Sequence, residues 1–324
     1  MIFTKECYNF VMQETFKHRM KKKELKVEKF LGQMDKIVPW DSLVEAIRPY
    51  YKSENGRRPH DLLLMLRIHF LQLWNNLSDP GMEEAIYDRN SFQKFLGFDC
   101  FGGVVPDETS ILRFRHLLEE HGLSSKILKL VNDYLSTKGL VLQRGTIVDA
   151  TLLSAPVSKK NKSNKRDPEM SSTRKNNKWY FGAKGHIGVQ SEGKPIIHSC
   201  EFSTAKDADI THMTKLFHGE EQAIFGDSGY TSKEDKVGSR HLGLYYGIAD
   251  RGARKHPLSN SQKKRNRKHA SIRAKVEHPF RIIKDLWGHR KLRYKGLDKN
   301  ASQFKTLCSL SNLYFCRKDL MPTG

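Results

Sequence analysis

The spacing of apolar positions changes near residue 139. Before that point apolar side chains recur every three or four residues, the spacing of amphipathic helices, as in segments 40–51, 58–77 and 81–96. From Leu140 onward they alternate with polar residues or form short runs, as in strands. The pattern predicts a helical region over residues 1–138, followed by a mixed α/β domain over residues 139–324.

Two of the predicted helices follow each other closely just before this change. The first begins at residues 106–110, with the sequence PDETS, and ends near Gly122; the second runs from about Ser124 to Gly139. Arg113 and Arg115 are expected to be exposed on the first helix. Such a helix pair reads DNA in some proteins, but more often it only packs in a core. Both interpretations stay open, and the first makes these two arginines candidate DNA contacts.

The second half of the chain contains five predicted strands. They span residues 141–150, 178–189, 195–203, 223–226 and 244–249. With a helix predicted at 210–217, this order is typical of a ribonuclease-H-like mixed sheet, in which the first strand and a later one lie side by side. Lys184 and His186 share the polar face of the second strand, which predicts either a DNA-binding groove or an ordinary solvated face.

Three acidic residues stand out because each is placed where a sheet or a helix could bring it to one point. Asp149 occurs in GTIVDAT, Asp227 in AIFGDSGY and Glu277 in SIRAKVEHPFRIIK. Arg273 precedes Glu277 by four residues and Lys284 follows it by seven, so an ideal helix brings the three side chains within about 40° of one face. This combination of acids and cations predicts a site that acts on phosphate groups.

Carboxylate oxygen atoms are the ligands that Mg²⁺ and Mn²⁺ prefer, and two such ions roughly 4 Å apart catalyse phosphoryl transfer in many enzymes. The three acids therefore predict a site for two Mg²⁺ or Mn²⁺ ions. A single aspartate at a strand end more often caps a turn. Asp207 and Asp209 are interpreted as caps of the helix beginning near Ile210, although either could approach the site.

The charge balance indicates a polyanionic partner. The chain has 57 lysines and arginines against 36 acidic residues, a formal charge of +21. Basic residues concentrate in segments 158–178 and 251–269, the second of which contains Lys263, Lys264 and Arg265. Both segments are expected to be solvated loops that become ordered when DNA neutralises their charge.

The cysteines and the apolar stretches favour a reduced, cytoplasmic protein that does not enter a membrane. The five cysteines, at positions 7, 100, 200, 308 and 316, lack the spacing of a zinc site. The longest apolar stretch, near residues 62–66, is far shorter than the roughly 20 residues that cross a bilayer. The start of the chain has no signal-peptide pattern.

Motifs along nearly the whole chain resemble the DDE transposases of bacterial insertion sequences, specifically the insertion-sequence-five type. They include GRRPHDLLLMLRIHFLQLWNNLSDPGMEEAIYD, PDETSILRFRHLLEEHGL, GTIVDATLLSAP, KNKSNKRDPEM, WYFGAKGHIGV, LFHGEEQ, DSGY and ASIRAKVEHPFRIIK followed by RYKGLDKN. By this resemblance Asp149, Asp227 and Glu277 are the metal-binding acids, and Arg273 and Lys284 match the family's Arg-x3-Glu-x6-Lys pattern.

The resemblance implies an enzyme that binds the terminal inverted repeats of its own element, cleaves the DNA there and joins the 3′-hydroxyl to target DNA. It also implies double-stranded DNA as partner, a homodimer or higher oligomer on DNA, and a bacterial, nucleoid-associated location. The chain departs from the wider family pattern at Ala270, where a tyrosine is usual, and after Tyr230, where the loop is shorter than in the prototype.

Pro279 is expected to kink the helix that carries Glu277.

Two other functions remain open for the three acids and the basic segments. One is a metal-dependent nuclease that cuts without joining. The other is a transposase-derived DNA-binding protein with weak catalysis or none.

Overall fold

The computed structural model describes residues 23–52, 58–98, 104–159, 165–175, 177–253 and 256–321. Most of the lysine-rich start of the chain, Cys7 and Cys100 lie outside these ranges, as do parts of both predicted basic loops. The three cysteines within them, Cys200, Cys308 and Cys316, are buried free thiols. None of the described helices combines the length and the apolar character that a bilayer crossing requires.

Helices account for the regular structure of the described chain up to Thr137, as the apolar spacing predicts. They are α2 (Lys26–Ile37), α3 (Trp40–Ile47) with a 3-10 turn at Arg48–Tyr50, α4 (Leu62–Asn75), α5 (Asp79–Asp88), α6 (Asn90–Leu96), α7 (Glu108–Glu120) and α8 (Leu123–Thr137). Side-chain caps begin three of them: Asp61, Ser78 and Asp107 each accept a backbone N–H of the first turn.

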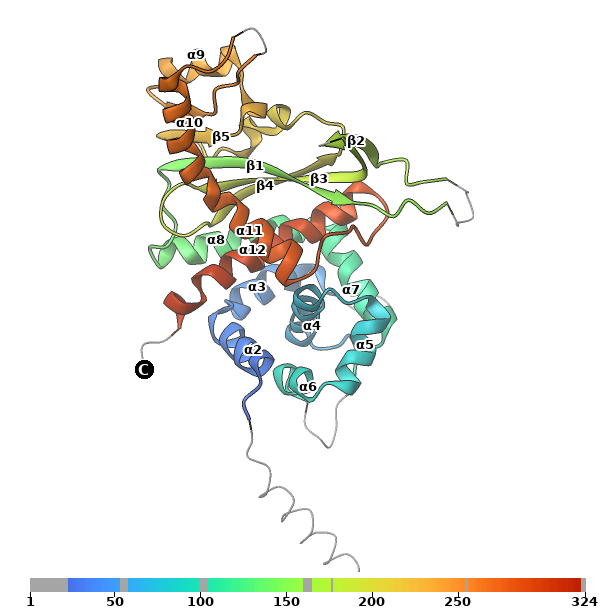
Figure 1. The fold of residues 1–324 in the computed structure, drawn as a ribbon. Coiled ribbons are helices and arrows are strands. Elements are labelled where there is room, and N and C mark those ends of the chain that lie inside the picture. Colours follow the sequence, from blue (N-terminus) through green and yellow to red (C-terminus); the bar gives the residue numbers. More distant parts are fainter. Residues whose placement is uncertain are drawn as a thin grey trace, which may run out of the picture.

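The second half is built on a mixed sheet (Figure 1). Its strands are β1 (Gly145–Ser154), β2 (Ser171–Lys175), β3 (Lys178–Gln190), β4 (Ile197–Thr204), β5 (Ala223–Gly226) and β6 (Tyr245–Ile248). Strand β3 runs antiparallel to β1, β2 and β4, whereas β1, β5 and β6 are mutually parallel in that order. The mixed α/β architecture is therefore confirmed.

Three local predictions in this half are wrong. The first strand lies at 145–154 instead of 141–150, so Asp149 is inside the strand and does not end it. Strand β2 occupies part of the predicted basic loop, because cross-strand pairing with β3 overrides its polar composition. The predicted helix at 210–217 is replaced by two 3-10 turns, Asp209–His212 and Thr214–Leu216.

The helices of the second half are α9 (Lys233–His241), α10 (Asn260–Arg273), α11 (Glu277–Arg281) and α12 (Leu297–Leu320). Much of the predicted loop at 251–269 is thus helical, and a capping box between Ser259 and Gln262 begins α10. A 3-10 turn, Ala274–Val276, connects α10 to α11, and a π-helical turn, Ile282–Leu286, follows. The irregularity expected at Pro279 takes the form of these changes in helix type.

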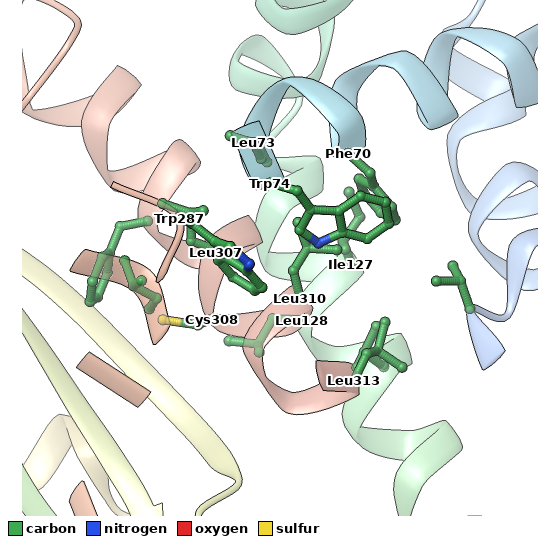
Figure 2. Packing of buried hydrophobic residues seen from close by; sticks show 14 of the residues in the cluster. Phe70, Leu73, Trp74, Ile127, Leu128, Trp287, Leu307, Cys308, Leu310 and Leu313 are labelled. Atoms are coloured by element: carbon green, nitrogen blue, oxygen red, sulfur yellow. The ribbon is translucent and has the colours of Figure 1, made fainter. Parts of the chain in front are cut away.

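Helix α12 connects the two halves of the molecule. Figure 1 shows it between the sheet and the N-terminal helices, and it contacts α2, α7, α8, β3 and β4. Figure 2 shows the packing: Phe70, Leu73 and Trp74 of α4 face residues of α8 and α12, together with Trp287. One continuous apolar cluster therefore holds the sheet, α12 and the N-terminal helices together.

Candidate active site

Asp149 lies on β1, and Asp227 directly follows the neighbouring parallel strand β5. The pairing of β1 with β5 ends at Ile147 and Phe225, and each aspartate comes two residues after its member of this pair. Side chains two positions apart share a face of the sheet, so both carboxylates point to the side on which Ile147 and Phe225 are buried. The chain thus brings two acids, 78 positions apart in the sequence, to one edge of the parallel pairing.

Backbone N–H groups hold one oxygen atom of each carboxylate. Ala150 N–H donates to Asp149 Oδ1 at 2.8 Å, and Gly229 N–H donates to Asp227 Oδ1 at 2.7 Å. The second oxygen atom of each group has no hydrogen bond to any residue that the structure describes. The two free oxygen atoms are thus available for an external ligand.

The electrostatic environment of Asp149 is unfavourable for its charge. Burial raises the pKa of the Asp149 carboxyl to about 6, and the negative charge of Asp227 acts in the same direction. The Ala150 N–H and the Arg273 guanidinium oppose this shift but do not cancel it. A bound cation would compensate this charge more fully than the protein does alone.

Arg273 ends α10 beside this pair of acids. Its buried Nε has no hydrogen-bond partner, and within the described ranges it forms no ion pair shorter than 4.0 Å. Glu277, one turn further along, is exposed and likewise lacks a hydrogen bond or ion pair among the described residues. The charge of Arg273 thus acts on Asp149, whereas Glu277 forms no hydrogen bond or ion pair that ties it to the site in the described chain.

Lys284 is anchored to β1. Its Nζ donates to Thr151 Oγ1 at 3.0 Å and to the Leu152 carbonyl oxygen at 3.1 Å, close to Asp149 in the strand. Burial lowers the pKa of this ammonium group, and the charges of Arg290 and Lys175 also lower it. In this arrangement Lys284 fixes the position of the π-helical turn on β1.

Lys184 and His186 line neither an open groove nor a solvated face, so both sequence-based interpretations of this strand face are wrong. The Lys184 Nζ donates to Asp209 Oδ1 at 2.8 Å and to the Asp207 carbonyl oxygen at 2.7 Å. His186 is fully buried, and its Nε2 lies 2.8 Å from Ser203 Oγ. The two 3-10 turns that replace the predicted helix cover this face, with the His212 ring stacked 4.4 Å from that of His186.

The prediction that Arg115 is exposed is also wrong. Its guanidinium donates to Asp79 Oδ2 at 2.9 Å and to Glu119 Oε1 at 2.8 Å, and its side chain is only 7% exposed. The tyrosine ring of Tyr294 covers it at 4.1 Å. Arg113, on the opposite side of α7, is exposed as predicted.

The basic residues of the predicted second loop form an exposed helical surface. Lys263, Lys264 and Arg265 all lie on α10, the helix that ends at Arg273. Arg265 donates to Asp250 at 2.9 Å, while neither lysine has an ion-pair partner in the described ranges. The exposed positive charges therefore lie on the same helix that ends, at Arg273, beside the two aspartates.

Sequence reasoning missed two residues near the acids. Tyr230 is completely buried and its hydroxyl has no hydrogen-bond partner among the described residues. Burial raises the pKa of this hydroxyl, and the charges of Asp149 and Asp227 add to the effect. Its position directly after Asp227-Ser-Gly was an available signal. Lys175 on β2 acts electrostatically on Asp149, but nothing distinguished it within a basic segment.

The residues present fit a divalent cation in part. Asp149 and Asp227 offer hard oxygen atoms, each with one atom free of internal hydrogen bonds, and their mutual repulsion favours a shared cation. No group of three histidine, cysteine, aspartate or glutamate side chains close enough to hold a metal occurs within the described ranges. Two of the three predicted ligands are thus assembled in this conformation.

Comparison with known families identifies the chain's relatives. The model of the "Transposase DDE domain" matches residues 142–313, which is more than half of the chain. The chain belongs to the DDE transposase family. A second transposase domain model, DUF772, matches residues 18–117, and the two together indicate an insertion-sequence transposase.

Among solved structures, this transposase is similar to the crystal structure of the Mos1 strand transfer complex. The two share 12% identity, with a TM-score of 0.20, over 75% of this chain and 82% of that chain.

Proposed function

We propose that this transposase acts on the inverted terminal repeats of its own insertion sequence, of the insertion-sequence-five type. It cleaves the DNA at the element's ends and joins the freed 3′-hydroxyl to target DNA. The observation that carries the proposal is the pair Asp149, on β1, and Asp227, directly after the adjacent parallel strand β5. Each carboxylate retains an oxygen atom without a hydrogen-bond partner among the described residues.

A ribonuclease-H-like catalytic domain over residues 139–324 is part of the proposal. The sheet order β4-β3-β1-β5-β6 supports it, with an antiparallel meander continued by two strands parallel to the first. Residues 1–138 form the helical region that recognises the ends. Their shared core with α12 would transmit the position of bound DNA to the sheet.

Asp149 and Asp227 would hold two Mg²⁺ or Mn²⁺ ions, and Glu277 would complete the site when DNA is bound. Such ions, when bound, activate the attacking oxygen atom and stabilise the charge on the leaving oxygen atom of a phosphodiester. Glu277 lies one turn after Arg273, which already acts on Asp149, so a small adjustment of α11 brings its carboxylate towards the pair.

The cations around the acids have separate roles in this proposal. Arg273 faces the acids without an ion-pair partner of its own in the described chain and would contact the phosphate beside the reacting bond. Lys284 holds the helix on β1. Lys263 and Lys264 of α10, together with Arg113, would contact the DNA backbone at a greater distance.

The transposase is proposed to act as a homodimer or larger assembly that pairs two DNA ends. Chemical crosslinking on labelled end DNA tests this arrangement. Crosslinked species containing at least two chains are expected during joining. A complex of a single chain with a single DNA end that completes joining would contradict it.

The test of the reaction uses a labelled duplex from the repeats that flank the gene, incubated with Mg²⁺ and target DNA. The native chain should cut and join it, whereas Asp149→Asn, Asp227→Asn and Glu277→Gln should bind the duplex without cutting. Glu234→Gln, at an exposed acid on α9, is the matched control. Cutting without joining would indicate a nuclease, and binding without cutting a transposase-derived DNA-binding protein.

A further inference from the structure

The tip of the β2–β3 hairpin carries an unusually exposed tryptophan. Trp179 is 72% exposed, whereas the other three tryptophans, Trp40, Trp74 and Trp287, are at most 8% exposed. A large aromatic side chain left in water loses the free energy that its burial would contribute. A single exposed ring does not define a binding surface, so the groups around Trp179 decide what it can bind.

The residues around Trp179 are cations. Arg174 is directly opposite Trp179 in the β2–β3 pairing, and Lys175 is directly opposite Lys178. Like charges in opposite positions destabilise a sheet. Within the described ranges neither lysine has an ion-pair partner, and all three cations are exposed. The hairpin tip is thus suited to an anionic partner.

The two acids of the segment just before β2 bind the start of α12 and do not form ion pairs with the cations of the tip. Asp167 accepts the backbone N–H of Gly296 at 2.7 Å, and Glu169 accepts that of Leu297 at 2.8 Å. Both carboxylates thus attach the segment before β2 to the start of α12. The positive charge of the tip remains available to a ligand.

The base of the hairpin is fixed to the catalytic strand. Ala155 N–H, just after β1, donates to the Phe181 carbonyl oxygen at 2.8 Å. Gly182 lies so close to the Leu153 carbonyl oxygen that any side chain there would collide with it. Lys175 is near enough to act electrostatically on both Asp149 and Lys284. DNA bound at the acids would therefore extend past this hairpin.

We propose that the β2–β3 hairpin tip grips the DNA end, with Trp179 stacked on an unpaired base and Arg174, Lys175 and Lys178 on the adjoining phosphates. This proposal rests on the proposed function and adds a contact that separates the strands next to the reacting bond. Stacking requires a free base face, which a duplex offers only where its pairing is opened. A protein partner would need further apolar surface here, and the neighbouring exposed side chains, such as Arg174, Lys178 and Asn177, are charged or polar.

The first test uses tryptophan fluorescence of the full chain without metal ions, so that no DNA is cut. Trp179 is the one highly exposed tryptophan of the four, so iodide should quench mainly its emission. A DNA end with a short single-stranded overhang should protect Trp179 from iodide, and a blunt duplex of the same sequence should protect it less. Unchanged quenching on the bound overhang would overturn the proposal.

The second test measures binding of the same two DNAs by variants. Trp179→Leu should weaken binding of the overhang about tenfold, within the range measured for base stacking on aromatic side chains, and binding of the blunt duplex much less. Trp179→Phe should retain most of the affinity. Leu242→Ser, at a residue 82% exposed directly after α9 and outside the helical end-recognition region, is the control. Equal losses for both DNAs would contradict stacking on an unpaired base.

The cations are tested in the same assay. Replacing Lys175 and Lys178 by Gln should weaken both DNAs and reduce the salt dependence of binding, whereas Gln at the exposed Lys236 and Lys299 should not. An unchanged salt dependence would exclude these phosphate contacts. If native protein cuts and joins DNA but Trp179→Leu has no effect on either DNA, this inference fails alone. If Trp179 is protected but no DNA is cut, the proposed function fails alone.

Discussion

Two largely buried arginines, Arg115 and Arg273, differ in what surrounds them. Arg115 in the helical region binds two carboxylates, Asp79 and Glu119, and packs beneath a tyrosine ring. Arg273 lies beside two carboxylates as well, yet it forms no ion pair within 4.0 Å in the described chain, and one of the acids has a raised pKa. The charge of Arg115 is balanced by two carboxylates that it binds, whereas Arg273 has no such ion pair in the described chain.

This difference separates structural charge from functional charge. The buried guanidinium of Arg115 is held by two carboxylates, which balance its charge, although its Nε, like that of Arg273, has no hydrogen-bond partner among the described residues. Acids and cations that are close but unpaired cost stability, and a site accepts that cost where a ligand later supplies the missing partners. The sequence alone did not reveal this difference, because it predicted both arginines as possible DNA contacts.

The largest expected effect comes from replacing Arg115 and so removing its two ion pairs. Arg115→Met should lower the free energy of unfolding by about 3–5 kcal/mol, because Asp79 and Glu119 then remain charged without a partner. Arg273→Met should lower it by much less while reducing DNA cleavage. Urea unfolding measures both, and equal losses in the two variants would show that the two groups do not differ.

The next effect concerns Asp149 and pH. Between about pH 4 and the folded-state pKa of about 6, the folded protein holds a proton that the unfolded chain has released, so stability falls as pH rises through this window. Asp149→Asn removes the charge and should be about 1–3 kcal/mol more stable than the native chain above pH 6, without metal ions.

The difference should disappear below about pH 4, where the native carboxyl becomes protonated in the unfolded chain as well. Thermal or urea unfolding across this pH range measures it. A variant that is less stable than the native chain above pH 6 would contradict the assignment of an uncompensated charge. Glu234→Asn, at an exposed position, should show little pH-dependent difference.

A smaller effect is expected at Lys284. Lys284→Met removes hydrogen bonds to Thr151 and Leu152 and should cost about 1–2 kcal/mol of stability. If this lysine mainly positions the helix, DNA affinity and its salt dependence should change little in the variant. A clear decrease in salt dependence would instead assign it a direct phosphate contact.

The smallest effect compares unpaired and paired cations on a single helix, α10. Lys263→Gln and Lys264→Gln should each reduce the slope of log affinity against log salt by up to about 1, because each lysine is unpaired in the described structure. Arg265→Gln should reduce it less, since Asp250 already partners this arginine. Equal changes at all three positions would show that internal pairing does not determine DNA contact.

The sequence predicted the general fold because its periodicity is a local property. Helical spacing before residue 138 and strand spacing after it are both present in the structure. The errors fall where tertiary contacts decide. Strand β2 exists only through its pairing with β3, and α10 is a helix despite a highly charged composition.

The candidate site likewise has features that the sequence predicted and features that it could not predict. The approach of Asp149 to Asp227 follows from a strand order that the sequence suggested. The burial of Arg115 and His186 depends on partners distant in the chain, Asp79 and Ser203, which no local pattern reveals. The role of Glu277 remains a prediction from resemblance.

The most direct test of the account replaces an oxygen ligand by sulfur. Asp227→Cys should abolish DNA cleavage with Mg²⁺, which binds thiolates poorly, and regain part of it with Mn²⁺, which tolerates a softer ligand. Asp209→Cys, at an acid already held by Lys184, should show no such dependence on the metal. Restoration by Mn²⁺ at position 227 alone is the predicted result. Cleavage by Asp227→Cys with Mg²⁺ at the native rate would contradict a metal site formed by Asp149 and Asp227.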